Sequence, residues 1–431
     1  MKRLAIAVSL ILASGAEARD FLEIYELAVQ NDAQFAASGA TLEARREAEP
    51  IARSGLLPQI ALSGSANRLN QSTEGSSSET FNSNDWGVNL SQPIYRRDRW
   101  YQHKQAKDFV EQAEAEYETQ EQGLVLRVAQ AYFEVLAARD TLKTTKAQVK
   151  ALDRQLDQAQ QRYDVGLVAI TDVLEVKATR DNAVSEEIQA QQLLDDANEA
   201  LREIIATDPG TLAGVPDKLA LAPPQPNDVN AWEAKAIENN PGLKAAQEAV
   251  QVAEKEVEIQ KSGHYPALDL VAGYNDSNST ARRALDIDGS SVGVQLSLPI
   301  YTGGRVSSLT REAKHNLTAA QDNLTSTQRA LERQVADAYR GVLTSISQVN
   351  ALYSARVANE SSLAATQAGY EVGTRTIVDV LLVQRNFFVA ERDYAVSRYG
   401  YILNLLLLED AVGDLDDEDV RRVNGWLKEG A

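Results

Sequence analysis

The sequence predicts an α+β membrane protein in which each chain contains four β-strands and long antiparallel helices, arranged as two structural repeats. Three observations lead to this prediction. Two hairpin-like segments match each other when Gly166 is placed on Gly373, 207 residues further along the chain. Four stretches alternate apolar and polar side chains over about eleven residues, the length of a strand that crosses a bilayer at a tilt. Residues 97–163 contain no proline and a single glycine, which is typical of one long helix.

The repeated segments are residues 162–176 and 369–383. Each lies between two helical patterns, and its central glycine can adopt the left-handed backbone conformation that a sharp helix end needs. Both segments therefore predict the tight end of a helical hairpin. Two unrelated helix ends are the alternative, but equivalent places in two similar halves favour a repeat.

The N-terminus predicts an export signal. Lys2 and Arg3 precede an apolar run, and Ala16-Glu17-Ala18 fits the small-residue cleavage rule. A buried N-terminal helix is the alternative. Beyond this region no stretch reaches the roughly 18 consecutive apolar residues that a membrane-spanning helix needs.

Composition excludes several classes of protein and site. The chain has no cysteine, which removes disulfides, thiolate metal sites and a lipid-bearing N-terminal cysteine. Its net charge is −19, from 62 acidic and 43 basic residues, and no basic face of the kind that binds nucleic acid is evident.

The predicted segments follow one another without overlap. They are a signal peptide over residues 1–18, a first repeat over 19–207, a proline-rich linker over 208–230, a second repeat over 231–410 and an acidic tail over 411–431, which we expect to be mobile. The predicted strands are residues 58–70, 84–95, 266–276 and 290–301. Within the first repeat, we expect Thr171 to cap the helix that follows the Gly166 turn.

The strand pattern has a physical consequence. One face of each strand is apolar and the other is small and polar, as lipid and an aqueous lumen require. Four strands cannot close a barrel, because known membrane barrels begin at about eight strands. Open sheet edges are not tolerated in lipid, so several chains would have to share one barrel. The alternative is a pair of β-hairpins packed on the helices of a soluble protein.

The helix pattern points to the same kind of assembly. Apolar residues from Ala106 to Val135 recur at alternating steps of three and four, the spacing of a coiled-coil seam. The seam is rich in alanine, so the helices should lie close together. Helices of this length need partners of equal length, and a cylinder of antiparallel helices is the economical arrangement.

Nearly the whole chain after residue 18 resembles the TolC family of outer-membrane channel proteins. The resemblance rests on both repeats, on Pro93-Ile94-Tyr95 and Pro299-Ile300-Tyr301, and above all on residues 369–381, GYEVGTRTIVDVL. It implies a homotrimer whose twelve-stranded β-barrel, with four strands from each chain, lies in the Gram-negative outer membrane. A long antiparallel α-helical barrel would extend into the periplasm and end in coiled-coil hairpin tips that are closed at rest.

The resemblance also implies a function. The assembly would be the passive exit duct of a tripartite efflux or type I secretion system, opened at its periplasmic end by partner proteins. The implied partners are outer-membrane lipid, a periplasmic membrane-fusion adaptor protein and an inner-membrane ABC exporter or proton-driven pump. It implies neither nucleic acid nor a cofactor or metal. Whether the cargo is a small molecule or an unfolded protein stays open.

The family's functional positions can be transferred by the motif match. They are a periplasmic gate at Thr171, Asp172, Tyr370 and Arg375, a constricting acidic ring at Asp379, and adaptor-docking tips at Val165, Gly166, Leu167, Val372, Gly373 and Thr374. A second acidic ring is doubtful, because Leu382 stands where the family pattern has another aspartate. The alternative for Asp172 and Asp379 is a carboxylate that favours a helix N-terminus through the macrodipole.

Motifs for catalysis are missing from the sequence. There is no phosphate-binding glycine loop, no H-E-x-x-H and no G-x-S-x-G. The three histidines, His103, His264 and His315, are far apart in sequence. We therefore expect a protein that is not an enzyme. A secreted coiled-coil scaffold or adhesin without a pore and, more remotely, a periplasmic enzyme are the competing hypotheses.

Overall fold

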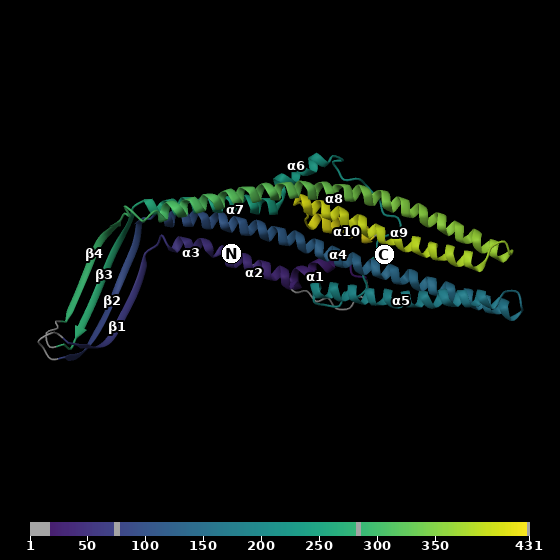
Figure 1. Cartoon of the computed structure of the whole chain (residues 1–431), viewed down its shortest axis with the longest axis horizontal. Helices are drawn as coiled ribbons and strands as arrows, with labels where there is room; N and C mark the ends of the chain where they lie inside the picture. The colour runs from purple at the N-terminus through teal and green to yellow at the C-terminus, as the bar shows by residue number, and fades with distance from the viewer. Residues whose placement is uncertain (1–17, 73–77, 282–285, 429–431) are drawn as a thin grey trace. The chain divides into compact units, whose positions relative to one another are not determined.

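A computed structural model of the chain describes residues 18–72, 78–281 and 286–428 (Figure 1). The predicted signal peptide therefore lies outside the described residues except for Ala18. Among the helices of the described ranges, none combines the length and apolarity that crossing a membrane requires.

The same order of elements occurs in both halves of the chain (Figure 1). The first half consists of α1 (Phe21–Asn31), α2 (Ala33–Arg46), α3 (Ala48–Ser54), β1 (Gln59–Gln71), β2 (Glu79–Tyr95), α4 (Arg97–Asp164) and α5 (Ile170–Ile205). The second half consists of α6 (Val229–Asn239), α7 (Pro241–Lys261), the short 3-10 helix η1 (Ser262–His264), β3 (Ala267–Ser279), β4 (Ile287–Ser297), α8 (Arg305–Glu371) and α9 (Ile377–Val412), followed by α10 (Asp417–Lys428).

These elements form two compact units, and α4 and α8 each run through both. The sheet unit comprises Gly39–Tyr117 and Pro241–Arg329, and the hairpin unit comprises Glu118–Asn240 together with the chain before Gly39 and after Arg329. The sheet unit contains all four strands, and the hairpin unit contains both predicted hairpin tips.

The sheet has the strand order β1-β2-β3-β4, with every neighbouring pair antiparallel. Strand β2 begins earlier than predicted, at Glu79, because it stays paired with β1 as far as Gln71. Strand β4 ends earlier than predicted, at Ser297, so Pro299-Ile300-Tyr301 lies outside the sheet. The equivalent Pro93-Ile94-Tyr95 lies inside β2, where the pairing with β3 shifts register, as expected at a residue that cannot donate a hydrogen bond.

One face of the sheet is apolar and open to its surroundings. Leu62 pairs with Val88, and Ala272 pairs with Val292, so these side chains share a face. Leu62 and Val292 are 75% and 78% exposed. Apolar side chains exposed this widely and contiguously mark a surface that contacts lipid or another protein.

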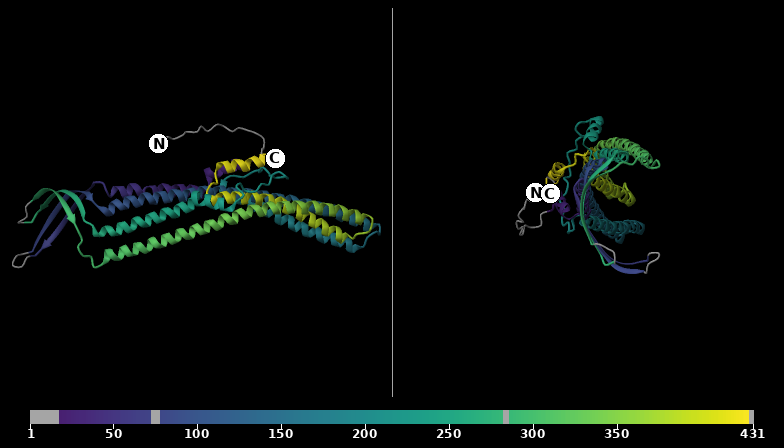
Figure 2. Two further views of the ribbon diagram at one scale, coloured as in Figure 1. Left: turned by 90° about the horizontal axis from the view of Figure 1, so that it is seen from above. Right: turned by 90° about the vertical axis from the view of Figure 1, so that its left-hand side faces the viewer.

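In the hairpin unit α4 and α5 share an apolar core, and Tyr353 of α8 lies against Tyr394 of α9, with ring centres 5.5 Å apart (Figure 2). In α5 the buried positions Ala183, Ala190 and Ala197 are seven residues apart, as are Val335, Val342 and Val349 in α8. A seven-residue repeat is the spacing of a coiled-coil seam, and alanine in the seam lets helices approach closely. Of the seam predicted in α4, Ala106, Ala113, Ala131 and Val135 are buried.

The linker between the two halves is anchored on the hairpin unit by hydrogen bonds from buried side chains. Tyr132 donates to the carbonyl of Ala213 at 2.8 Å, and Trp232 donates to the carbonyl of Pro226 at 2.8 Å. Arg398 of α9 donates to the carbonyl of Pro216 at 2.6 Å. These contacts satisfy backbone carbonyls of an irregular segment that forms no helix or sheet hydrogen bonds of its own at these positions.

The prediction of a mobile C-terminal tail is wrong, since Asp417–Lys428 forms α10. Val420, Val423 and Leu427 are fully buried at helical spacing. Asn424 donates to Asp20 at 2.9 Å, which connects α10 to the start of α1. The acidic residues that suggested a solvated tail lie in the first turn of α10, where the helix dipole favours negative charge.

Candidate functional site

Both long helices end in the same backbone motif. At the first tip, the amide of Gly166 donates to the carbonyl of Tyr163 and the amide of Leu167 donates to that of Arg162, both at 2.8 Å. At the second tip, the amides of Gly373 and Thr374 make the equivalent bonds at 3.1 and 2.8 Å, to the carbonyls of Tyr370 and Gly369. This pattern of two hydrogen bonds is a Schellman motif, which satisfies the last carbonyls of a helix.

The two central glycines have the backbone conformation that the repeat predicted. The φ angles are +74° at Gly166 and +80° at Gly373. No atom lies within 4 Å of the place where a Cβ would stand at either residue, so the need for glycine comes from the backbone conformation and not from crowding. The prediction of two sharp helix ends at these positions is confirmed.

The helices that follow the turns begin differently. Helix α5 has Ala169 as its N-cap, with no side-chain hydrogen bond, so the prediction of Thr171 as the cap is wrong. Thr171 lies inside the first turn of α5, two residues after the N-cap position. Helix α9 instead begins with a complete capping box, in which Thr376 accepts from the amide of Asp379 and Asp379 accepts from the amide of Thr376.

The capping box fixes the carboxylate of Asp379. Its Oδ2 accepts hydrogen bonds from the amide and the hydroxyl of Thr376, both at 2.9 Å. These bonds, first from the backbone and then from the side chain, lower the pKa of Asp379, and the charge of Arg375 lowers it further. Asp379 is therefore a helix-terminal carboxylate as the alternative interpretation held, and its place in an acidic ring remains a prediction.

The predicted gate residues do not form one cluster in the single chain. The ring of Tyr370 lies against the guanidinium of Arg162, 5.0 Å from its centre. Thr171 donates to Asp172 over a long 3.4 Å. Among the residues that the structure describes, no hydrogen bond joins Tyr370 or Arg375 to Thr171 or Asp172.

An apolar core lies below the tips and joins the two hairpins. Its buried members come from α4, α5 and α9, with Tyr370 packed against them. They are Val149, Leu152, Ala159, Val173, Val176, Ala183, Ile377 and Leu381. The two tips of one chain are thus held together mainly by apolar contact, with the Arg162–Tyr370 pair at the edge.

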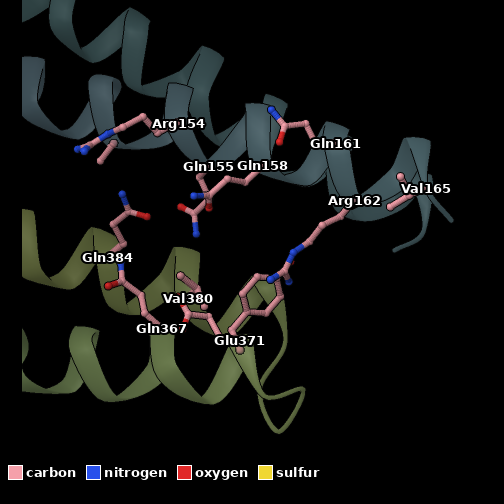
Figure 3. Close-up of a pocket in the computed structure, with 12 residues that line it drawn as sticks. Arg154, Gln155, Gln158, Gln161, Arg162, Val165, Gln367, Glu371, Val380 and Gln384 are labelled. Atoms are coloured by element: carbon pink, nitrogen blue, oxygen red, sulfur yellow. The ribbon is translucent and has the colours of Figure 1, made fainter. Parts of the chain in front are cut away.

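An open cavity of about 830 Å³ lies beside this core, and its lining is rich in glutamine (Figure 3). Arg154, Arg162 and Gln155 line it from α4, and Gln384 lines it from α9. The Oε1 atoms of Gln155 and Gln384 are buried without a hydrogen-bond partner. Unpaired buried acceptors are costly, so these two amide oxygens are poorly satisfied polar groups of the lining.

The predicted docking residues lie at the exposed ends of the hairpins. Val165, Leu167 and Val372 are 69%, 74% and 75% exposed. The hydroxyl of Thr374 is already used, because it donates to the carbonyl of Gly369 at 3.0 Å. Each tip therefore presents apolar side chains on a backbone turn that is fixed by its own hydrogen bonds.

The family model of the outer membrane efflux proteins matches residues 24–207 and 232–414. The chain belongs to the outer membrane efflux protein family. As a family member it is a channel protein of the Gram-negative outer membrane and not an enzyme. The resemblance to TolC and the predicted location are thereby confirmed.

Curated relatives of the efflux protein match over nearly its whole length. Outer membrane protein TolC of Vibrio cholerae serotype O1 is 38% identical over 422 residues, covering 97% of this chain and 96% of the relative. TolC of Escherichia coli strain K12 is 34% identical over 442 residues, covering 99% and 89%. The alkaline protease secretion protein AprF of Pseudomonas aeruginosa is 27% identical over 428 residues, covering 97% and 89%.

Solved structures share the fold of this efflux protein. CusC superposes with a TM-score of 0.81 at 16% identity, covering 96% of this chain and 98% of that structure. The CmeC outer membrane channel of Campylobacter jejuni superposes with a TM-score of 0.80 at 16% identity, covering 95% and 90%.

Two residues of the tips were missed by sequence reasoning. Thr376 had a detectable signal, because Thr376-Ile377-Val378-Asp379 has the spacing of a capping box ahead of an apolar run. Arg162 had none, since its contact with Tyr370 joins residues 208 positions apart that only tertiary packing brings together. Within the described ranges, no group of three or more His, Cys, Asp or Glu side chains is placed to hold a metal ion.

Proposed function

We propose that three copies of this chain form the exit duct of an efflux or type I secretion system, a channel without catalytic activity that crosses the outer membrane. The observation that supports the trimer is the sheet. It has four strands in one layer, with β1 and β4 at open edges and an exposed apolar face. Pairing β4 of each copy with β1 of the next would remove every open edge and give twelve strands.

The hairpin tips are the proposed moving part. In this proposal they close the periplasmic end at rest, through polar contacts between copies at Thr171, Asp172, Tyr370 and Arg375. Support comes from the single chain, where Thr171 and Asp172 share one long hydrogen bond and Tyr370 lies at the tips against Arg162. Three copies of Asp379 would form one acidic ring, and Leu382, which is exposed, would form an apolar collar beside it.

The same tips are the proposed docking surface for a periplasmic adaptor protein, which would connect the duct to an inner-membrane pump or exporter. Both tips present the same turn, with a valine before the glycine. A family model named for efflux matches residues 24–207 and 232–414, and a relative named for protease secretion matches 97% of the chain, so both kinds of cargo belong to the proposal.

Two measurements test the proposal. Membranes from cells that express the chain should yield a trimer that only detergent extracts and that dissociates on heating. A freely soluble monomer would overturn the assembly and favour a secreted scaffold. Gly166→Pro and Gly373→Pro should abolish export while leaving trimers in the membrane, because proline cannot adopt a positive φ. Normal export by both variants would contradict the docking role.

A further inference from the structure

The polar face of the sheet has a single carboxylate that is neither paired with a basic residue nor at the strand ends. This inner face is defined as the face opposite to Leu62, Trp86 and Val292. From the Ser65–Asp85 pair toward Gln59 at the start of β1, the residues of this face are mainly serine, asparagine, glycine and glutamine. The two charged residues there are Asp85 and Asp269, and Arg96 forms an ion pair with Asp269 at 3.1 Å.

Serine hydroxyls from three adjacent strands donate to the carboxylate of Asp85. Ser277 of β3 donates to Oδ1 at 2.5 Å. Ser83 of β2 and Ser65 of β1 donate to Oδ2 at 3.2 and 3.4 Å. Hydroxyls that donate to a carboxylate favour its ionised form and restrict its rotamer. Asp85 is therefore a fixed negative charge on this face.

The assignment of Asp85 to the inner face follows from the pairing register. Asp85 is opposite Ser65 on β1 and opposite Ser277 on β3, so these three side chains share one face. The neighbouring residue Trp86 lies on the other face, where its ring is 5.3 Å from that of Tyr274. An aromatic pair at the end of an apolar band is typical of the lipid-facing side of a membrane strand.

We propose that Asp85 makes the barrel of the assembled channel selective for cations. The proposal rests on the proposed trimer, in which the inner face lines the lumen and three copies of Asp85 form a ring. A ring of one sign of charge in a low-dielectric wall concentrates counter-ions, because the field lines stay in the aqueous path. Among the described residues of the inner face at this level, Asp85 is the one that is charged, so the ring gives the wall there a negative sign. It is separate from Asp379, which belongs to the hairpin unit.

The chain contains no cysteine, so a single thiol can be placed at this site and nowhere else. In the experiment, trimers of Asp85→Cys are inserted in a planar bilayer under a KCl gradient, and the reversal potential gives the cation-to-anion permeability ratio. Loss of the carboxylate should lower this ratio by about 2-fold or more relative to the unsubstituted channel. An anionic methanethiosulfonate reagent should restore the ratio, and a cationic one should lower it further. Because each channel is compared before and after modification, a folding defect cannot imitate the result.

The matched control is Asp276→Cys. Asp276 follows Asn275 and precedes Ser277 on β3, so it lies at the same level as Asp85 but on the outer face, opposite Trp86. Its substitution and modification should leave the permeability ratio unchanged. The measurements are repeated with Asp379→Asn in every channel, so that charge at the hairpin tips does not dominate the ratio.

The outcomes separate the ring from the trimer. Ion-conducting channels whose ratio is the same for Asp85→Cys and the unsubstituted protein, before and after modification, would overturn the selectivity ring alone. An equal response at Asp276 would place that residue in the lumen and overturn the assignment of faces. Failure of the unsubstituted protein to form any ion-conducting channel would overturn the proposed function and the ring together.

Discussion

The capping box at the start of α9 allows the structural role of Asp379 to be separated from its predicted role in an acidic ring. Thr376→Val removes the cap hydroxyl and leaves the carboxylate, whereas Asp379→Asn removes the charge and leaves an oxygen that can accept from the Thr376 amide. Losing a threonine N-cap costs about 1 kcal/mol. Since 1.4 kcal/mol corresponds to a factor of ten, local opening of the first turn of α9 should become about fivefold more frequent in Thr376→Val.

Two assays read the two roles. Hydrogen exchange of the amides of residues 379–381 reports opening of the helix start, because these are the first amides of α9 with an acceptor. Block of single-channel current by a multivalent cation on the periplasmic side reports the ring. Thr376→Val should speed exchange about fivefold and keep the block. Asp379→Asn should abolish the block with a smaller effect on exchange. Hard cations take several carboxylate oxygens at once, which is why three copies of Asp379 are expected to bind one.

The pH dependence gives an independent check on the cap. The pKa of Asp379 is lowered in the folded protein, chiefly by the backbone bond from Thr376. A lowered folded-state pKa stabilises the folded tip above the unfolded pKa of the carboxyl, and this contribution is lost as the pH falls through the lower, folded value. Exchange at residues 379–381, corrected for its intrinsic pH dependence, should therefore rise only on acidification. Block that persists in Asp379→Asn, or exchange that is unchanged in Thr376→Val, would refute the assignment.

Four further predictions follow from single contacts. Gly373→Ala should destabilise the second tip by about 1–2 kcal/mol, because a left-handed backbone is unfavourable for alanine. Gly123→Ala inside α4 should instead stabilise that helix by about 0.5–1 kcal/mol, and local hydrogen exchange measures both effects. Leu427→Ala should cost about 2–5 kcal/mol by opening a cavity under α10, seen as a lower thermal midpoint of the trimer. Tyr370→Leu should raise resting conductance in a planar bilayer more than Tyr370→Phe does, because phenylalanine keeps the ring that faces a guanidinium. Leu382→Asp should strengthen cation block by adding a second ring of carboxylates. Equal block of the Leu382→Asp channel and the unsubstituted channel would contradict the place of Leu382 at the constriction.

Much of the fold could be predicted because its determinants are periodic in the sequence. Alternation over the strands, the three- and four-residue spacing of apolar positions along α4, and a glycine at each tip all act through local geometry. The extent of β2 was underestimated because residues 79–83 are polar except for Phe81, and pairing with β1 rather than composition extends the strand. Helix α10 was missed for a similar reason, since its acidic residues concealed the helical spacing of Val420, Val423 and Leu427.

The tips were predictable in position but not in their contacts. A positive φ at Gly166 and Gly373 is a local property, and the match between the two segments was sufficient to predict it. The contact of Tyr370 with Arg162 depends on how two hairpins pack, which no spacing within one segment encodes. The polar face of the sheet gave a weaker signal still, because the three serines around Asp85 come from three strands and meet only through the register.

The two tips show how one substitution between similar segments gives equivalent residues different roles. Asp172 and Asp379 occupy the same place relative to their glycines, but the residue three positions earlier is Ala169 in one tip and Thr376 in the other. Thr376 completes a capping box, so the carboxylate of Asp379 is fixed by two hydrogen bonds at the start of α9. Ala169 has no side chain that can accept from the helix, and Asp172 is left with one weak contact at 3.4 Å. A fixed charge suits the proposed acidic ring, whereas a carboxylate with a weak partner suits the proposed gate contact.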